Sequence, residues 1–185
     1  MEKEKLYSGI SKCAWGYFFL YFDINLNAVS ILPSFVGFWL FLGALELLEQ
    51  EERELKLLRP LGVGLLCWHL ISWGLSWVNI TPENLIPAAD VVICVINLYF
   101  HFQLVTNLAA IAARHQGPEA ALDRRLLSCR TMQTVVFTVL MVLERFAGIF
   151  GDLWIYLSFL LIIVYLIAGI RIMSALFALR KELAQ

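Results

Sequence analysis

Long apolar runs alternate with short polar segments along the whole chain. A transmembrane helix needs roughly 20 mostly apolar residues to cross the hydrocarbon layer. The apolar runs are, in chain order, 8–22, 29–48, 60–79, 87–113, 131–150 and 153–179. The pattern predicts an all-α polytopic membrane protein, a bundle of about six transmembrane helices. The run 8–22 is the least apolar, and it either crosses the membrane or lies at its interface.

Basic residues occur in every second segment that connects the apolar runs. Lys and Arg favour cytoplasmic segments of membrane proteins. They occur in 1–12, 49–59, 114–130 and near the C-terminus, whereas 23–30 and 80–86 contain none. This distribution predicts three hairpins with outer turns near 23–30, 80–86 and 146–153. Both termini are then cytoplasmic.

The composition agrees with this topology. Of the 185 residues, 61% are apolar and 16% are charged, whereas a soluble domain is nearer half apolar and a quarter charged. The length fits a single transmembrane domain over 1–185. A basic nucleic-acid-binding face is absent, and the four cysteines lack the spacing of a zinc site or a disulfide framework. Because no small-residue cleavage site follows the N-terminal run, we expect that run to be retained.

The segment after the first run carries a resemblance. Asp23-Ile24, followed by Ile31-Leu32-Pro33-Ser34-Phe35-Val36-Gly37, resembles the start of a group of small multispanning membrane proteins of Gram-positive bacteria. That group tends to carry an acidic residue where Ser34 stands. The resemblance covers the first quarter of the chain. It implies a location in the bacterial cell membrane (the inner membrane) and no particular activity.

The predicted fourth span concentrates polar residues on one stripe. At 100° per residue, Asp90, Cys94, Asn97 and His101 fall within about 60° of one another. Polar groups are costly in hydrocarbon, so such a stripe marks a helix interface, a water-filled cavity or a functional site. We therefore expect it to face the interior of the bundle.

The predicted third span presents a matching face. His69, Ser72 and Ser76 lie within about 60° on a helix. Counted from the outer turn near Glu83, His69 and Asn97 are equally distant, so an antiparallel hairpin brings them to the same depth. We expect His69, Asn97 and His101 to converge there. These groups either hydrogen-bond neighbouring helices or bind a solute or relay a proton. A metal site is less favoured, because no set of three convergent ligands is evident.

A second polar group lies at the outer end of the predicted fifth span. Arg145 follows Glu144 there, and Asp152 begins the sixth span. One interpretation is that Arg145 pairs with Asp152 or Asp90 and stabilises the bundle. The other is an outward-facing vestibule in which Arg145 holds an anionic group or the nearby carboxylates hold a cation.

These features rank the candidate functions. The first is binding or transport of a small solute in a polar pocket between spans three, four and five; its ligand-binding residues are predicted to be His69, Ser72, Ser76, Asp90, Asn97, His101 and Arg145. The alternative is a non-catalytic partner or regulatory subunit that docks another protein through cytoplasmic helices at 46–59 and 118–130. An intramembrane enzyme ranks third, because no GxSxG or paired-aspartate motif is present. The sequence indicates no cofactor, and the bilayer is the one partner that it implies directly.

Overall fold

The protein is described from a computed structural model, which covers residues 2–22, 25–26, 29–30, 33–78, 87–117, 119–151 and 153–184. These residues form helices, apart from one two-residue antiparallel ladder in which Asn25 pairs with Ser30. The elements are α1 (Glu2–Tyr21), β1 (Asn25–Leu26), β2 (Val29–Ser30), α2 (Ser34–Leu48), η1 (Arg53–Leu57), α3 (Leu58–Ser76), α5 (Pro87–His115), α6 (Leu122–Glu144), α7 (Ala147–Phe150) and α8 (Leu153–Leu183).

Several helix boundaries differ from the apolar runs. α6 begins at Leu122 rather than near 131, because the charged segment 122–130 continues directly into the apolar run as one helix. The run then breaks after Glu144, and the short α7 forms the turn to α8. α3 begins at Leu58, so Pro60 lies in its first turn, where the missing backbone N–H leaves no hydrogen bond unmade.

Four helices are long and apolar enough to cross a membrane among the residues that the structure describes. They are Arg53–Ser76, Val91–His115, Leu122–Glu144 and Leu153–Leu183. α2 has 15 residues and falls short of the usual span. α1 has 20 residues but carries charges in its first turn and Lys12 in its middle. The fold is therefore an all-helical bundle with four candidate membrane-spanning helices, rather than an established set of six.

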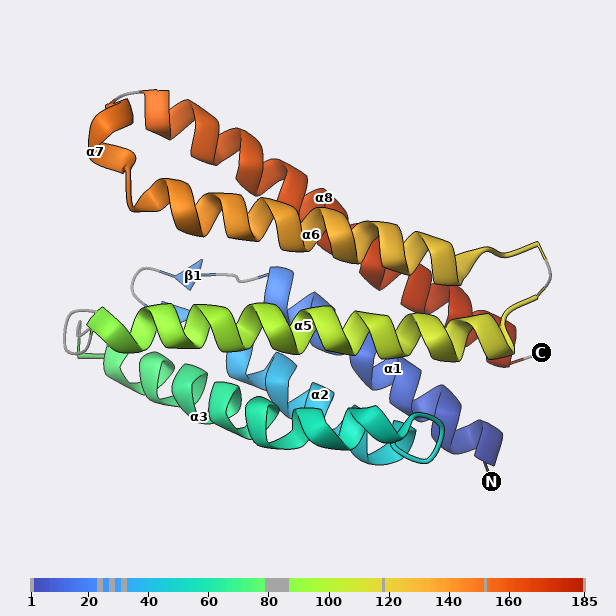
Figure 1. Ribbon diagram of the computed structural model, residues 1–185. Coiled ribbons are helices and arrows are strands. Elements are labelled where there is room, and N and C mark those ends of the chain that lie inside the picture. Colours follow the sequence, from blue (N-terminus) through green and yellow to red (C-terminus); the bar gives the residue numbers. More distant parts are fainter. Residues whose placement is uncertain are drawn as a thin grey trace.

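The helices form two groups that meet along part of their length (Figure 1). α1 packs against α2 and α8, while α6 packs against α5 and α8. α1 and α2 cross closely, because a Cβ at Gly37 would lie 2.8 Å from the carbonyl oxygen of Gly16. The α6–α7–α8 hairpin diverges from the other helices towards α7 (Figure 1).

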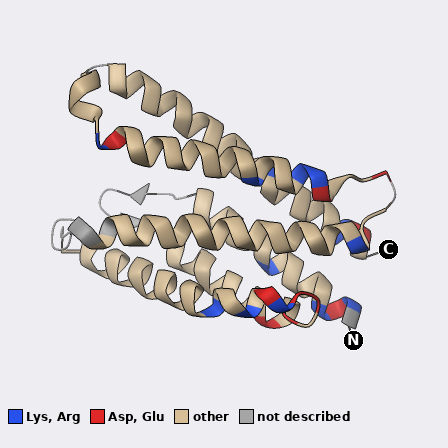
Figure 2. Ribbon diagram, in the orientation of Figure 1, with Lys and Arg blue, Asp and Glu red and all other residues tan. Residues whose placement is uncertain are grey.

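The apolar core occupies one half of this bundle. We call the half that contains both termini the inner half, and the half that contains α7 the outer half. Fully buried apolar side chains begin at Phe100 in α5 and at Ala168 in α8, and in α3 none follows Leu65 within the described residues. Charged residues also gather in the inner half, with Glu144 and Arg145 at the opposite end (Figure 2).

Outer-half side chains are apolar but exposed. Ile149 is 79% exposed, Tyr156 74% and Phe159 66%. Exposed apolar residues in such density are unusual for a soluble monomer, and they suit a surface that faces lipid.

Candidate ligand site between α5, α6 and α8

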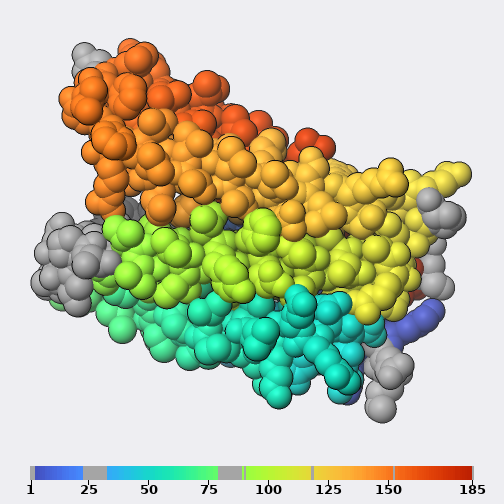
Figure 3. Space-filling view, in the orientation of Figure 1, coloured from blue at the N-terminus to red at the C-terminus, as the bar shows by residue number. Residues whose placement is uncertain are grey.

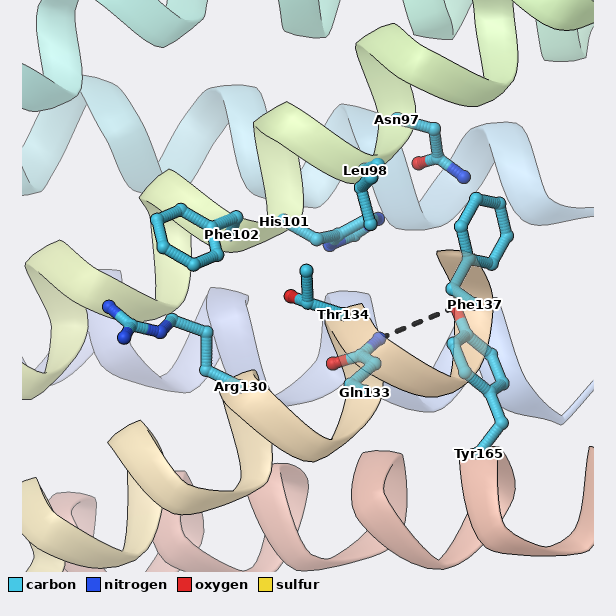
Figure 4. A pocket seen from close by; sticks show the side chains of 9 residues that line it. All are labelled: Asn97, Leu98, His101, Phe102, Arg130, Gln133, Thr134, Phe137 and Tyr165. Atoms are coloured by element: carbon cyan, nitrogen blue, oxygen red, sulfur yellow. Dashed lines mark hydrogen bonds between the residues drawn. The ribbon is translucent and has the colours of Figure 1, made fainter. Parts of the chain in front are cut away.

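A small cavity lies halfway along the bundle, where α5, α6 and α8 meet. It is lined by Asn97, Leu98, His101, Phe102, Arg130, Gln133, Thr134, Phe137 and Tyr165. Side chains from α5 and α6 point towards each other across this space, and Tyr165 reaches it from α8 (Figure 4). Its volume is about 10 Å³, close to the room that one water molecule needs.

Gln133 links three helices at this cavity. Its side-chain Nε2 donates to the hydroxyl of Tyr21 and lies 3.3 Å from the hydroxyl of Tyr165. The Tyr21 ring packs where α8 carries Gly169, because a Cβ there would overlap the ring. A buried amide in an apolar bundle needs such partners. Gln133, Tyr21 and Tyr165 therefore fix the depth at which α1, α6 and α8 meet.

His101 and Asn97 face the same cavity with unused hydrogen-bonding capacity. Nδ1 of His101 lies 3.3 Å from the hydroxyl of Tyr17, and the imidazole is 6% exposed. Nε2 of His101 and Oδ1 of Asn97 are buried, and neither has a hydrogen-bond partner in the described part of the chain. A buried polar atom without a partner costs about 1–3 kcal/mol. A bound molecule could satisfy both atoms.

A larger cavity lies next to the small one, towards α7. It has a volume of about 270 Å³ and is lined by Cys94, Phe137, Leu140, Met141, Glu144, Trp154, Ser158 and Ile162. The surface is indented between α5 and α6 at this end of the molecule (Figure 3). Phe137 borders both cavities. We call the larger cavity the outer chamber, which has mostly apolar walls, and the smaller cavity its polar floor.

The predicted site residues of α3 lie apart from this cavity. Nδ1 of His69 lies 3.1 Å from the Ser34 hydroxyl, and its ring stacks on Phe38 with centroids 4.8 Å apart. The centroid of the Phe38 ring also lies 5.9 Å from that of His101. The two histidines therefore both contact the Phe38 ring, at similar depth in the bundle. His101 turns towards α6 instead of α3.

The remaining predicted residues are also placed away from the polar floor. Ser72 has a buried hydroxyl with no partner among the described residues, and the Ser76 hydroxyl donates to the carbonyl oxygen of Trp73 at 2.6 Å. Arg145 is exposed directly after α6. The side chain of Asp90 and all of Asp152 lie outside the described residues, so the expected pairing with Arg145 does too.

Of the nine lining residues, sequence reasoning predicts Asn97 and His101 and misses the other seven, which include Arg130, Gln133 and Tyr165. Gln133 carried a usable signal, because it is an amide within an otherwise apolar run. The sequence predicts Arg130 at the end of a cytoplasmic helix, 118–130, ahead of the membrane span, so it is not predicted at a site inside the bundle. Tyr165 has no distinguishing sequence signal, because its neighbours are all apolar and tyrosine is common in such helices.

The described residues contain no group of three His, Cys, Asp or Glu side chains placed to hold a metal ion. Comparison with other proteins adds no further constraint. No protein-family model matches the chain, and no curated protein or solved structure matches it. The functional assignment therefore depends on the geometry of the cavity.

Proposed function

We propose that this chain is an integral membrane protein that binds a small solute in the cavity between α5, α6 and α8. One observation carries the proposal. His101 Nε2 and Asn97 Oδ1 are buried, unpartnered within the described residues, and on the wall of one cavity. Native proteins seldom leave such atoms unsatisfied. A solute that presents hydrogen-bonding groups would satisfy both.

The membrane location is supported by the distribution of apolar and charged residues. Large apolar side chains such as Tyr156 and Phe159 are exposed on α8, where lipid would cover them. Arg114, Arg180 and Lys181 lie in the last turns of α5 and α8, at the inner end. Since basic residues favour the cytoplasm, we place the inner end and both termini there, in a bacterial cell membrane.

The same proposal includes six membrane segments arranged as three hairpins within one domain, 1–185. α1 has 20 residues, which is about 30 Å of helix. α2 has 15 residues, or about 22 Å, so it covers the full width only with the residues before it. A hydrogen bond joins Tyr17 to His101 of α5, and Gln133 of α6 donates to Tyr21; these contacts support a first hairpin that closes the inner side of the cavity.

The orientation of the cavity favours binding from the outer side. The chamber of about 270 Å³ lies between the polar floor and the α7 end, whereas the inner half is filled by the apolar core. A solute would enter past Glu144 and Trp154 and reach His101 at the floor. Release of the solute to the inner side would require the apolar core to rearrange. We therefore propose binding as the function, and transport only if such a rearrangement occurs.

Native mass spectrometry of the protein purified in mild detergent tests the proposal. We expect a retained small molecule in the parent protein and its loss from Asn97→Leu, because that change removes a hydrogen-bonding amide from the cavity wall. Ser72→Ala is the matched control, since it removes a buried, unpartnered polar group on α3 outside the cavity. Equal retention in Asn97→Leu and the parent, or no retained mass under any mild extraction, would contradict the proposal.

The alternative function, docking of a protein partner through 46–59 and 118–130, receives less support. Glu51 lies 3.2 Å from His115, and Glu52 lies 2.7 Å from Arg114. Leu55 is fully buried. The segment 46–59 therefore packs on its own bundle and offers few free charges. A stoichiometric partner that co-purifies with the parent and is lost on deleting 118–128 would reverse this ranking.

A further inference from the structure

Arg130 brings a positive charge to the polar floor. Its Nη1 donates to the Thr106 hydroxyl at 2.7 Å, and its Cζ lies 4.2 Å from the centre of the Phe102 ring. Its Nε is buried without a hydrogen-bond partner among the described residues. None of the ion pairs in the described part of the chain includes Arg130. The guanidinium therefore lines the cavity as a cation without a carboxylate.

The depth of Arg130 makes this charge significant. It lies eight residues after the start of α6, which is about 12 Å along the helix. Thr106 lies nine residues before the end of α5, at about the same depth. Charged side chains this far along a membrane helix are costly and usually face a partner or a water-filled cavity. Thr106 supplies one hydrogen bond and no charge.

Carboxylates are present at the inner end, but several have other partners, such as Glu54, which accepts a hydrogen bond from Gln103 at 2.8 Å. Glu52 binds Arg114, and Glu49 lies 3.5 Å from Arg59. The nearest acidic residue along α6 towards the outer end is Glu144, 14 residues away, or about 21 Å along the helix. The floor of the cavity is therefore positive, while its outer rim carries a negative charge.

The outer chamber indicates that the ligand also has an apolar part. Leu140, Met141, Trp154 and Ile162 supply apolar walls, which suit a hydrocarbon or aromatic group. The floor has room for about one water molecule, so the group that reaches it must be compact. A carboxylate, whose oxygens match a guanidinium, would place one oxygen in this space and keep its second oxygen in the adjoining chamber.

We propose that the solute is a small amphipathic monocarboxylate, whose carboxylate is drawn to Arg130 and whose apolar part occupies the outer chamber. This inference rests on the proposed function and names its class of ligand. His101 Nε2, which has no partner among the described residues, donates to the carboxylate beside Arg130, and Phe137 packs where the head of the ligand meets its apolar part. The negative charge of Glu144 at the rim disfavours a second carboxylate on the ligand.

The test measures the charge preference of the floor directly. Thr134, four residues after Arg130 and in the same cavity, is replaced by Cys in a protein whose own four cysteines are changed to Ala. Two methanethiosulfonate reagents are compared: one with an anionic sulfonatoethyl group and one with a cationic trimethylammonioethyl group. We expect Arg130→Gln to lower the ratio of anionic to cationic rates about tenfold, as for a unit charge about 6 Å away in a water-like medium.

Two further variants isolate the role of the charge. Arg130→Lys keeps the charge and should keep most of the ratio. Arg124→Gln removes an exposed arginine of the same helix outside the cavity and should leave the ratio within about twofold of the parent value, since exposed charges are screened. An unchanged ratio in Arg130→Gln would overturn the anion preference while leaving a water-accessible cavity. Failure of both reagents to reach Cys at position 134 would instead overturn the proposed function.

A competition experiment needs no variant at Arg130 and covers the case in which Arg130→Gln does not fold. Octanoate should slow the labelling of the Thr134→Cys protein, whereas octylamine and octanol at equal concentration should not. Equal protection by all three would show that the chamber accepts any apolar chain, and it would contradict the carboxylate assignment.

Discussion

The inner and outer halves of the bundle are both built from apolar helices but are packed differently. In the inner half, α1 and α2 fill the space beside α5, and Phe41, Leu45 and Phe100 are fully buried. In the outer half, α6 and α8 diverge from α5 (Figure 1) and enclose a chamber of about 270 Å³. Phe159 and Tyr156 of that half are largely exposed. Apolarity alone therefore does not decide which residues form the core.

The difference follows from where α1 ends. Tyr17 and Tyr21 occupy its last two turns and contact His101 and Gln133, which lie near the middle of α5 and α6. Beyond that level, α1 contributes no further residue to fill the space. The polar floor therefore lies where the packed half meets the open half. A site at such a boundary combines a rigid base with an accessible mouth.

The largest expected effect comes from truncating an aromatic residue of the packed half. Phe41→Ala should lower the free energy of unfolding in detergent by about 3–5 kcal/mol, because its fully buried ring packs against Tyr17 with centroids 5.1 Å apart. Phe159→Ala, at a residue 66% exposed, should change it by less than about 0.5 kcal/mol. Similar losses in the two variants would show that the halves are packed alike.

Glycine-to-alanine substitutions should change the free energy of unfolding by a smaller amount, and differently in the two halves. Gly37→Ala should destabilise the protein by about 1–3 kcal/mol, because the new Cβ would meet the backbone of α1 at 2.8 Å. Nothing lies within 4 Å of a Cβ at Gly74. Gly74→Ala should therefore be neutral, or stabilising by up to about 1 kcal/mol, from helix propensity. Thermal unfolding of both variants would measure the difference, and destabilisation by Gly74→Ala would argue that the outer half is closed.

The smallest effect concerns the ion pairs at the inner surface. Glu52→Gln should cost less than about 1 kcal/mol, since its partner Arg114 is 47% exposed. The loss should shrink further at high salt. Thermal unfolding at two salt concentrations provides the measurement. A large, salt-independent loss would mean that this pair, rather than apolar packing, stabilises the inner half.

The helical class and the positions of the apolar segments could be predicted from the sequence, because runs of 20 apolar residues leave few alternatives. The inward orientation of His101 could be predicted too, since a polar stripe on a membrane helix avoids lipid. The start of α6 was less accessible. The sequence predicts a cytoplasmic helix at 118–130 and a membrane span from 131, whereas the structure has one helix from Leu122 to Glu144.

The partners of the stripe could not be predicted in the same way. Helical periodicity gives the direction of a side chain relative to its own helix, but not which neighbour it meets. α3 precedes α5 in the sequence, yet Phe38 of α2 lies against both His69 and His101. His101 consequently meets α1 and α6. Gln133 and Tyr165 enter the site through tertiary packing, which one sequence does not determine.

Thiol labelling at two neighbouring positions of α8 tests the open outer half most directly. Ser158 lines the chamber, whereas Leu160 is 58% exposed on the outside of the bundle, where we place lipid. Single cysteines at 158 and 160 in the cysteine-free protein would be labelled in intact cells with a membrane-impermeant maleimide. We predict rapid labelling at 158 and little at 160. Protection of both positions, or faster labelling at 160, would contradict a water-filled chamber between α5, α6 and α8.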